Sequence, residues 1–349
     1  MKTFDIQNLI RENIKTMKPY SSARDEFKAF DQNIIFLDAN ENPNENGVNR
    51  YPDPQQKTVK LALSEIKKVP ENQILLGNGS DEVLDLLFRA FCEPNKDNVI
   101  TLPPTYGMYG VLANLNAIEN REVLLNNKFE PQIDKILSKV DSNTKMIFLC
   151  SPNNPTGNSF DAKNIKILLN DFNGIIVLDE AYIDFSEKES WLQEINDYPN
   201  LVITQTLSKA YGMAGIRLGI LYASLEIIAI INKIKPPYNI NVLTQGKALE
   251  YINNQEIINK QIAEIKDQRN LVYGQLLNTN FVTEIYKTDA NFILCKVDDA
   301  NKRYNQILEK GIVIRNRTND VLCENCLRIT IGTVSENQKL IEVLKDLDI

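Results

Sequence analysis

The sequence predicts an α/β protein with two parts: a large domain built on a mostly parallel sheet flanked by helices, and a smaller α+β domain. Short continuous apolar runs alternate with helix-like segments over much of the chain. Strands that are covered by helices on both faces give such runs, because neither face meets water. The 349 residues, 43% hydrophobic and 24% charged, have ordinary globular composition and suffice for two domains.

The large domain is expected over residues 31–236, and a helical N-terminal arm at residues 1–30 is expected to pack on the smaller domain. After the turn-rich YPDPQQ, the segment KTVKLALSEIKKV has the apolar spacing of an amphipathic helix. A glycine-bearing turn then leads into a helix within GNGSDEVLDLLFRAFC. Five later apolar runs end in proline or polar residues and are predicted as strands: NVITLPP, KMIFLCSP, GIIVLDEAY, LVITQTLSK and RLGILYA.

The pattern changes at residues 235–241, KPPYNIN, where two prolines interrupt it. A long polar helix is predicted at residues 255–277. It is followed by the strand-like runs NFILCKV and CLRITIG, with the helix-like NKRYNQILEKG between them. These elements predict a smaller α+β domain over residues 237–349.

The composition excludes several classes of protein. The chain carries a formal net charge of −7 and contains no histidine. An acidic chain binds nucleic acid poorly, and without histidine there is no Ser-His-Asp triad, histidine base or histidine-ligated metal. No apolar run approaches the roughly 18 residues of a membrane span, and the first 20 residues lack the apolar core of a signal peptide. We therefore expect a soluble cytoplasmic protein with no membrane or nucleic-acid partner.

The five cysteines form neither a disulfide framework nor a metal site. Cys92, Cys150 and Cys295 lie in apolar runs and are interpreted as core residues. Cys323 and Cys326 form a C-x-x-C pair, but a zinc site normally needs four ligands, and this pair precedes a strand rather than a helix. We interpret the pair as structural and expect no bound metal.

The ends of the predicted strands carry the candidate site, because open parallel sheets bind ligands beyond the carboxyl ends of their strands. Gly79 and Ser80 open a helix whose free N–H groups suit a phosphate. Tyr106 can stack on a flat ring, and Asn154 can donate to a ring oxygen. Taken singly, these residues are also typical of a helix cap, a core tyrosine and a turn.

The next two strand ends carry an acid and an amine. Asp179 ends the buried run GIIVL and needs a partner there, and Tyr182 follows three positions later. The strand after that leads to Lys209 in a bed of small residues. Three expected phosphate ligands lie close to it in the sequence: Thr206, Ser208 and Arg217.

Together these side chains fit one ligand. It has a phosphate, a protonated ring nitrogen, a ring oxygen and a carbon that an amine can attack. Pyridoxal 5′-phosphate has all four, and the sequence therefore predicts this cofactor, held covalently by Lys209 with Asp179 opposite its ring nitrogen.

Ten motifs make the chain resemble the fold-type I aminotransferases and, more narrowly, the histidinol-phosphate aminotransferase family. SPNNPTG with the Ser-Lys pair and a downstream arginine is typical of the superfamily. The narrower resemblance rests on RYPDPQ, FCEP, PPTYGMY and LRITIGT. The remaining motifs are NENP, GNGSDE, LDEAYIDF, TLSKAYGMAGIRLG and GIVIR. Asn78 replaces a glycine common in the family's phosphate turn, where asparagine tolerates a positive φ, and Tyr211 stands where phenylalanine is common.

The resemblance implies an amino transfer from L-glutamate to imidazole acetol phosphate, giving 2-oxoglutarate and L-histidinol phosphate in histidine biosynthesis. It implies three catalytic residues: Lys209, Asp179 and Tyr182. It implies a cofactor site made of Gly79, Ser80, Asp81, Tyr106, Asn154, Asp179, Tyr182, Thr206, Ser208, Lys209, Arg217 and, from the neighbouring subunit of a homodimer, Tyr51. The implied substrate-binding residues are Tyr20, Asn40, Tyr51, Asn154, Arg315 and Arg328.

Other proteins share the cofactor residues and remain as alternatives. One is an aromatic or broad-specificity aminotransferase, and another is a threonine-phosphate decarboxylase. A third is a regulator that binds the same cofactor, but it would need a DNA-binding domain, and residues 1–30 are too short for one.

Overall fold

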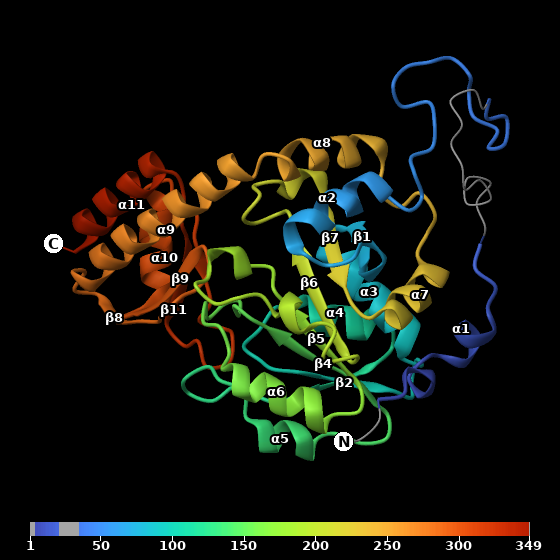
Figure 1. Cartoon of the computed structure of the whole chain (residues 1–349). Helices are drawn as coiled ribbons and strands as arrows, with labels where there is room; N and C mark the ends of the chain where they lie inside the picture. Colours follow the sequence, from blue (N-terminus) through green and yellow to red (C-terminus); the bar gives the residue numbers. More distant parts are fainter. Residues whose placement is uncertain (1–3, 21–34, 349) are drawn as a thin grey trace.

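A seven-stranded sheet in the order β1-β7-β6-β5-β4-β2-β3 forms the centre of the computed structural model, which describes residues 4–20 and 35–348 (Figure 1). β2 to β6 run parallel, and β7 is antiparallel to both β1 and β6. The connection at residues 207–217 is too short for the crossover that a parallel strand needs, so β7 turns back. The predicted mostly parallel sheet is confirmed. Its strands are β1 (Ile74–Asn78), β2 (Asn98–Thr101), β3 (Glu119–Glu122), β4 (Thr144–Cys150), β5 (Ile175–Asp179), β6 (Leu201–Thr206) and β7 (Leu218–Tyr222).

Helices cover both faces of this sheet. Successive strand residues alternate between two apolar clusters, as Leu75 and Leu76 do on β1. One face packs against α3 (Gly79–Phe91), α4 (Met108–Leu115) and α7 (Leu225–Ile234). The other packs against α2 (Lys57–Lys67), α5 (Ile133–Ser138), α6 (Ala162–Asp171) and α8 (Val242–Ile252). Short 3-10 helices occupy several connections: η3 (Glu71–Gln73), η4 (Ile183–Phe185), η5 (Trp191–Glu194) and η6 (Ala214–Ile216).

The smaller unit has a four-stranded sheet in the order β10-β11-β9-β8. Its strands are β8 (Val282–Ile285), β9 (Phe292–Val297), β10 (Arg315–Asn316) and β11 (Cys326–Thr330). One face packs with α9 (Gln255–Leu277), α10 (Ala300–Glu309) and α11 (Val334–Leu347) in a third apolar cluster. The other face, through Phe292 and Leu294, joins the core of the large unit. The predicted helix at residues 255–277 is confirmed.

The helix α9 connects the two units (Figure 1). Ile258 near its start belongs to the core of the large unit, and Val272 and Leu276 near its end belong to that of the smaller unit. α8 also packs with the large unit through Ala248. The domain boundary at residues 236–237 stays a prediction.

The N-terminal arm packs on the large unit in its described part, so the expectation that it packs on the smaller one is wrong there. It contains η1 (Ile6–Asn8) and α1 (Glu12–Thr16). Ile6, Ile10 and Ile14 join the apolar cluster of α3 and α7, and the Arg11 N–H donates to the Ala90 carbonyl at 3.1 Å. These isoleucines are buried where the apolar faces of α3 and α7 meet. Residues 21–30 of the predicted arm lie outside the described residues.

In the parts of the chain that the structure describes, no helix has both the length and the apolar character needed to cross a bilayer. The C-x-x-C pair is buried in the core cluster that joins the two units. The same parts of the chain contain no group of three acidic or cysteine side chains placed to hold a metal ion.

Candidate active site

One pocket lies beyond the carboxyl ends of β4, β5 and β6, where the sequence predicts a site. Every predicted cofactor residue lines this pocket except Gly79 and Tyr51. Gly79 directly precedes the lining residue Ser80 in the sequence. The lining residues are Ser80, Asp81, Tyr106, Cys150, Asn154, Asp179, Ala181, Tyr182, Thr206, Ser208, Lys209 and Arg217. They come from connections far apart in the sequence, which the parallel strands bring to the same edge of the sheet.

The first turn of α3 closes one end of this pocket. Gly79 begins the helix with φ +76°, and a Cβ there would lie 2.5 Å from Nη2 of Arg217. Arg217 has a left-handed backbone with φ 54°, a costly conformation of the kind that clusters at functional sites. Its carbonyl accepts from the Gly79 N–H at 2.8 Å, and its guanidinium pairs with Asp81 at 3.5 Å. A helix start and a guanidinium that face the same space suit a phosphate.

Asn78 keeps the phosphate turn intact without a positive φ. Its φ is −71°, and the left-handed position of the turn is taken by Gly79. The Asn78 side chain donates to the Asn239 carbonyl at 2.7 Å, and its N–H donates to the Glu82 carboxylate at 2.6 Å. The tolerance of asparagine for a positive φ is therefore not used here, and the Asn78 side chain ties the turn to the segment before α8.

Hydroxyl groups and a phenol complete this end of the pocket. The Thr206 hydroxyl donates to Oγ of Ser208 at 3.0 Å, and the Ser208 N–H donates back to Thr206 at 3.1 Å. The Tyr106 hydroxyl donates to Asp81 at 3.0 Å. Burial and the negative charge of Asp81 raise the pKa of Tyr106, so its ring is a neutral phenol at physiological pH.

Asp179 places a buried carboxylate at the end of β5. The Tyr109 hydroxyl donates to its Oδ2 at 2.7 Å, and the Ala181 N–H donates to its Oδ1 at 3.1 Å. Burial raises the pKa of Asp179, while these bonds oppose the rise. Neither donor carries a positive charge. A buried carboxylate in this environment is suited to a cationic partner such as a protonated ring nitrogen.

Lys209 offers its amine in the same pocket. Its Nζ lies 5.5 Å from the centroid of the Tyr182 ring. Burial, reinforced by the positive charge of Arg328, lowers the pKa of Lys209. A lower pKa leaves more of the lysine as the free amine, which is the form that acts as a nucleophile and as a general base.

Arg328 brings a positive charge from the smaller unit to the pocket. It lies on β11 and donates to the side-chain oxygen of Asn154. Its guanidinium lies 5.2 Å from the centroid of the Phe292 ring. Arg315, on β10, faces Arg328 directly in the antiparallel pair and is exposed. The two predicted substrate arginines are thus brought together beside Asn154.

The other three predicted substrate residues do not line the pocket of Lys209. Asn40 and Tyr51 line a separate groove, in which the Tyr51 ring stacks on Tyr238 with a centroid distance of 4.5 Å. Tyr20 is 72% exposed. Their assigned roles stay predictions.

The structure also reveals residues that the sequence analysis did not single out. Tyr109 bonds Asp179, and Cys150 and Ala181 line the pocket. Arg317 follows β10 and is, after burial, the strongest influence that lowers the pKa of Arg328. No local signal in the sequence marks Tyr109, because its partner Asp179 lies 70 positions further along the chain.

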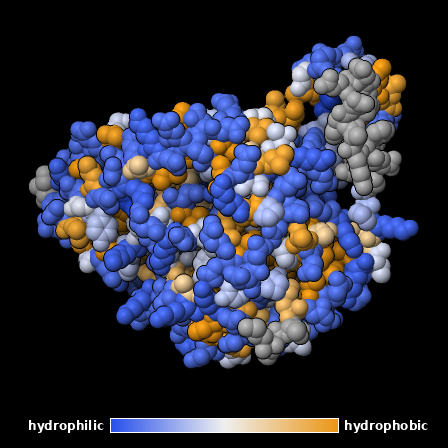
Figure 2. Space-filling view, in the orientation of Figure 1, coloured by the Kyte–Doolittle hydropathy of each residue, from blue (hydrophilic) through white to orange (hydrophobic). Residues whose placement is uncertain are grey.

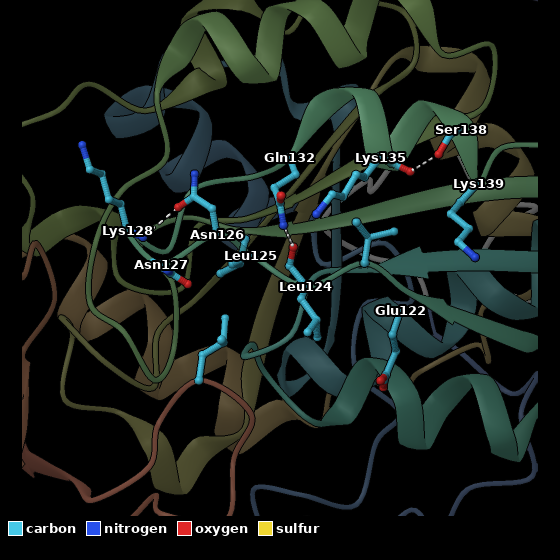
Figure 3. Close-up of a pocket in the computed structure, with 12 residues that line it drawn as sticks. Glu122, Leu124, Leu125, Asn126, Asn127, Lys128, Gln132, Lys135, Ser138 and Lys139 are labelled. Carbon is cyan, nitrogen blue, oxygen red and sulfur yellow. Dashed lines mark hydrogen bonds between the residues drawn. The ribbon is translucent and has the colours of Figure 1, made fainter.

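A second, more open groove lies over residues 122–139, on a different part of the large unit (Figure 3). Three lysines line it, and the Gln132 side chain donates to the Leu124 carbonyl at 2.8 Å. None of the predicted site residues is among its lining residues. Leu322, from the loop between β10 and β11, reaches its edge, so this loop of the smaller unit lies against the large unit.

Comparison with known proteins decides the family. Residues 28–344 match the model of aminotransferase class I and II. The chain belongs to the class I and II aminotransferases. It is 67% identical to a histidinol-phosphate aminotransferase of Flavobacterium johnsoniae over the full length of both chains. It is 64% identical to that of Christiangramia forsetii, over 100% of this chain and 99% of the relative.

Solved aminotransferase structures share the fold. The histidinol-phosphate aminotransferase of Clostridium acetobutylicum superposes with a TM-score of 0.80 at 25% identity, over 86% of this chain and 91% of that one. The histidinol-phosphate aminotransferase of Sinorhizobium meliloti, solved in complex with pyridoxal 5′-phosphate, superposes with a TM-score of 0.76 at 21% identity. The match covers 85% of this chain and 83% of that one. An L-threonine-O-3-phosphate decarboxylase of Porphyromonas gingivalis superposes with a TM-score of 0.72 at 25% identity, over 85% of this chain and 93% of that one. The fold alone therefore does not separate transaminase from decarboxylase.

The pocket of this aminotransferase fits pyridoxal 5′-phosphate on three independent grounds. A Cβ at Gly79 would fill the space in front of the Arg217 guanidinium, where a phosphate needs room. Asp179 is a buried carboxylate whose two donors are uncharged. Lys209 has a lowered pKa and lines the same pocket as Asp179 and Arg217.

Proposed function

We propose that this protein is a histidinol-phosphate aminotransferase that binds pyridoxal 5′-phosphate. It moves an amino group between L-glutamate and imidazole acetol phosphate, with 2-oxoglutarate and L-histidinol phosphate as products. The arrangement that carries the reaction type is the pocket holding Lys209, Asp179 and the first turn of α3. The 67% identity over the full chain carries the choice of substrate.

The protein's own residues each have a defined task. When bound, the cofactor supplies an aldehyde that accepts the amino group and a ring that accepts electrons from the substrate Cα. Asp179 would keep the ring nitrogen protonated, and Asn154 and Tyr182 would donate to the ring oxygen. Lys209 would hold the cofactor through its amine and, as a free amine, would serve as the general base that takes the proton from the substrate Cα. Its lowered pKa suits that task.

Both substrates are anions that bind to the same pair of arginines, Arg315 and Arg328. A carboxylate and a phosphate can each accept a forked pair of N–H bonds from arginine. Arg328 lies next to Asn154, and Arg315 faces it across the strand pair. The two half-reactions therefore occur in turn in one site, and the net charge of −7 does not oppose anion binding, because local cations set the potential of the site.

We further propose that the working unit is a cytoplasmic homodimer in which the partner subunit's Tyr51 reaches the cofactor phosphate. Residues 35–50 stand away from the body of the subunit (Figure 1). Ile35 and Leu37 on this segment are 82% and 88% exposed. Burying such side chains favours association, and a second subunit would cover them.

The absorbance of the purified, cofactor-loaded protein tests the proposal. L-Glutamate and L-histidinol phosphate, added separately, should each convert the aldehyde form of the cofactor to the amine form. Imidazole acetol phosphate should then reverse the change. Lys209→Ala should lose the absorbance of the lysine-bound cofactor and lose transamination by several orders of magnitude. Near-normal turnover by that variant would refute the assignment of Lys209.

Two further substrates separate the alternatives. Phenylalanine should convert the cofactor at least about tenfold more slowly than histidinol phosphate, because its side chain carries no anionic group that Arg315 and Arg328 can bind. Threonine phosphate should release no carbon dioxide. Faster reaction with phenylalanine would favour an aromatic aminotransferase, and carbon dioxide release would favour a decarboxylase.

A further inference from the structure

The strand pair β10–β11 presents three arginines on one face. Arg315 lies directly opposite Arg328 in the antiparallel register, and directly opposed residues share a face of the sheet. Arg317 lies two positions after Arg315, and its N–H donates to the Cys326 carbonyl at 2.8 Å, so the pairing continues to it. Alternate residues of a strand point the same way. Because Arg328 bonds Asn154, this face is directed toward the pocket of Lys209.

The charge of this arginine cluster is not balanced by acids on the same strand pair. The guanidinium of Arg317 pairs at 3.3 Å with Asp320, which lies in the loop between β10 and β11. The Arg317 side chain is 25% exposed. Nε of Arg317 and Nε of Arg328 are both buried, and neither has a hydrogen-bond partner among the described residues. Buried donors in folded proteins normally have partners, so these two indicate an anion that binds between the strands and the pocket.

Electrostatics supports the same interpretation. Burial and then the charge of Arg317 lower the pKa of Arg328, which means that the two guanidiniums disfavour each other in the absence of a ligand. Burial raises the pKa of the pocket residue Tyr182, and the charges of Arg328 and Arg317 oppose that rise, so Arg317 lies close enough to influence the pocket. An anion placed among these groups would relieve the repulsion.

The two substrates present different anions to this cluster. The glutamate side chain carries one negative charge on two oxygens, which one arginine fork can satisfy. A phosphomonoester carries a charge of roughly −1.5 to −2 at pH 7 and three acceptor oxygens. Its additional oxygen and charge require a second guanidinium.

We infer that Arg317 is a specificity-determining residue that recognises the second charge of the substrate phosphate, whereas Arg328 serves both substrates. This inference rests on the proposed function. It assigns Arg317 to the phosphate-bearing substrate, and it predicts that the residue has little effect on glutamate.

Steady-state kinetics of the cofactor-loaded Arg317→Gln variant tests this assignment. The variant should lose roughly 10- to 100-fold in kcat/KM for histidinol phosphate, mostly through KM, because a hydrogen bond to a charged group is lost. Glutamate should change by less than about threefold, since its contact with Arg328 remains. Arg317→Lys should recover part of the loss, because it keeps the charge. Equal losses for both substrates, or none for either, would overturn the inference.

The pH dependence separates recognition from a structural role. The second ionisation of a phosphomonoester has a pKa of about 6. The wild-type KM for histidinol phosphate should therefore fall as the pH rises through that value, as the dianion forms. Arg317→Gln should flatten this dependence. An unchanged profile in the variant would contradict recognition of the second charge.

Asp320→Asn is the matched control. If Arg317 serves only to hold the turn through its pair with Asp320, this variant should reproduce the loss seen in Arg317→Gln. Recognition of the phosphate predicts instead that kcat/KM for histidinol phosphate stays at or above the wild-type value, because a competing carboxylate has been neutralised. Failure of the wild type to turn over histidinol phosphate would count against the proposed function, whereas the variant comparison tests Arg317 alone.

Discussion

A single hydroxyl group, that of Tyr109, supports the buried carboxylate on which the proposed chemistry depends. Tyr109 is fully buried, its ring stacks on Phe148 with a centroid distance of 5.0 Å, and its hydroxyl donates to Asp179 at 2.7 Å. This packing holds the donor in one place. The bond favours the charged form of Asp179 and opposes the effect of burial on its pKa. Tyr109 is thus a positioning residue for Asp179, the acid proposed to face the cofactor ring.

Replacing Tyr109 by phenylalanine should weaken cofactor binding. Loss of the bond should raise the pKa of Asp179 further, so that the carboxylate is less often charged opposite the ring nitrogen. We expect the Kd for the cofactor, measured by titrating apoprotein, to rise about tenfold, which corresponds to one hydrogen bond to a charged group.

Tyr222→Phe is the control for this change. The Tyr222 hydroxyl is also buried, but it has no hydrogen-bond partner in the described structure and does not line the pocket. Its removal should leave the Kd unchanged. Equal effects of the two variants would show that Tyr109 acts only through general packing.

At the scale of the elements, the approach of β7 to the start of α3 shapes the phosphate end of the site. Gly219 on β7 lies so close to α3 that a Cβ there would be 2.3 Å from the carbonyl carbon of Gly79 and 2.4 Å from the backbone nitrogen of Ser80. Backbone atoms at this distance cannot move aside as a flexible side chain can. The antiparallel turn-back of β7 therefore needs glycine at this position.

Gly219→Ala should displace the first turn of α3, because the new methyl group meets backbone on both sides. We expect a loss of stability of about 1–3 kcal/mol, the usual cost of overpacking, and weaker cofactor binding. Thermal unfolding with and without cofactor measures both effects.

Gly215→Ala serves as the comparison for the same segment. A Cβ at Gly215 would meet no atom within 4 Å. This variant should unfold at or near the wild-type temperature with normal cofactor affinity. A stable Gly219→Ala variant with normal affinity would contradict the close-approach argument.

At the scale of the whole molecule, the site joins two units. The large unit supplies Lys209 and Asp179, and the smaller unit supplies Arg328 through a strand pair that reaches Asn154. The face shown in Figure 2 is mostly hydrophilic, with hydrophobic side chains also present on the projecting segment at its upper edge. That segment contains Asn40 and is followed by Tyr51, two predicted residues that line a separate groove.

The proposed homodimer predicts a mass of about twice 39.8 kDa for the wild type by light scattering. Leu37→Asp should shift the protein toward the monomer, because a charge replaces an apolar side chain that association would bury. Transamination should fall in parallel if the partner subunit's Tyr51 contributes to the site. A monomeric wild type with full activity would contradict the shared site.

The sheet-and-helix class and most residues of the pocket follow from the sequence alone. Continuous apolar runs are typical of parallel strands covered on both faces, and the carboxyl ends of such strands meet at one edge of the sheet. Asp179 ends β5, Asn154 and Lys209 follow the ends of β4 and β6, and Arg217 precedes β7. Their positions along the chain therefore predict that they lie close together. The reaction and the substrate were inferred from the resemblance to aminotransferases.

The contacts between distant segments could not be predicted from the sequence, because they form only when the chain has folded. Tyr109 and Gly219 have partners more than one element away, so no local pattern gives their roles. The arm at Ile6–Ile14 packs on the large unit because the apolar face that receives it is assembled from α3 and α7. Arg317 becomes a candidate only when β10 pairs with β11, because the alternation of side chains across a paired strand sets which guanidiniums share a face.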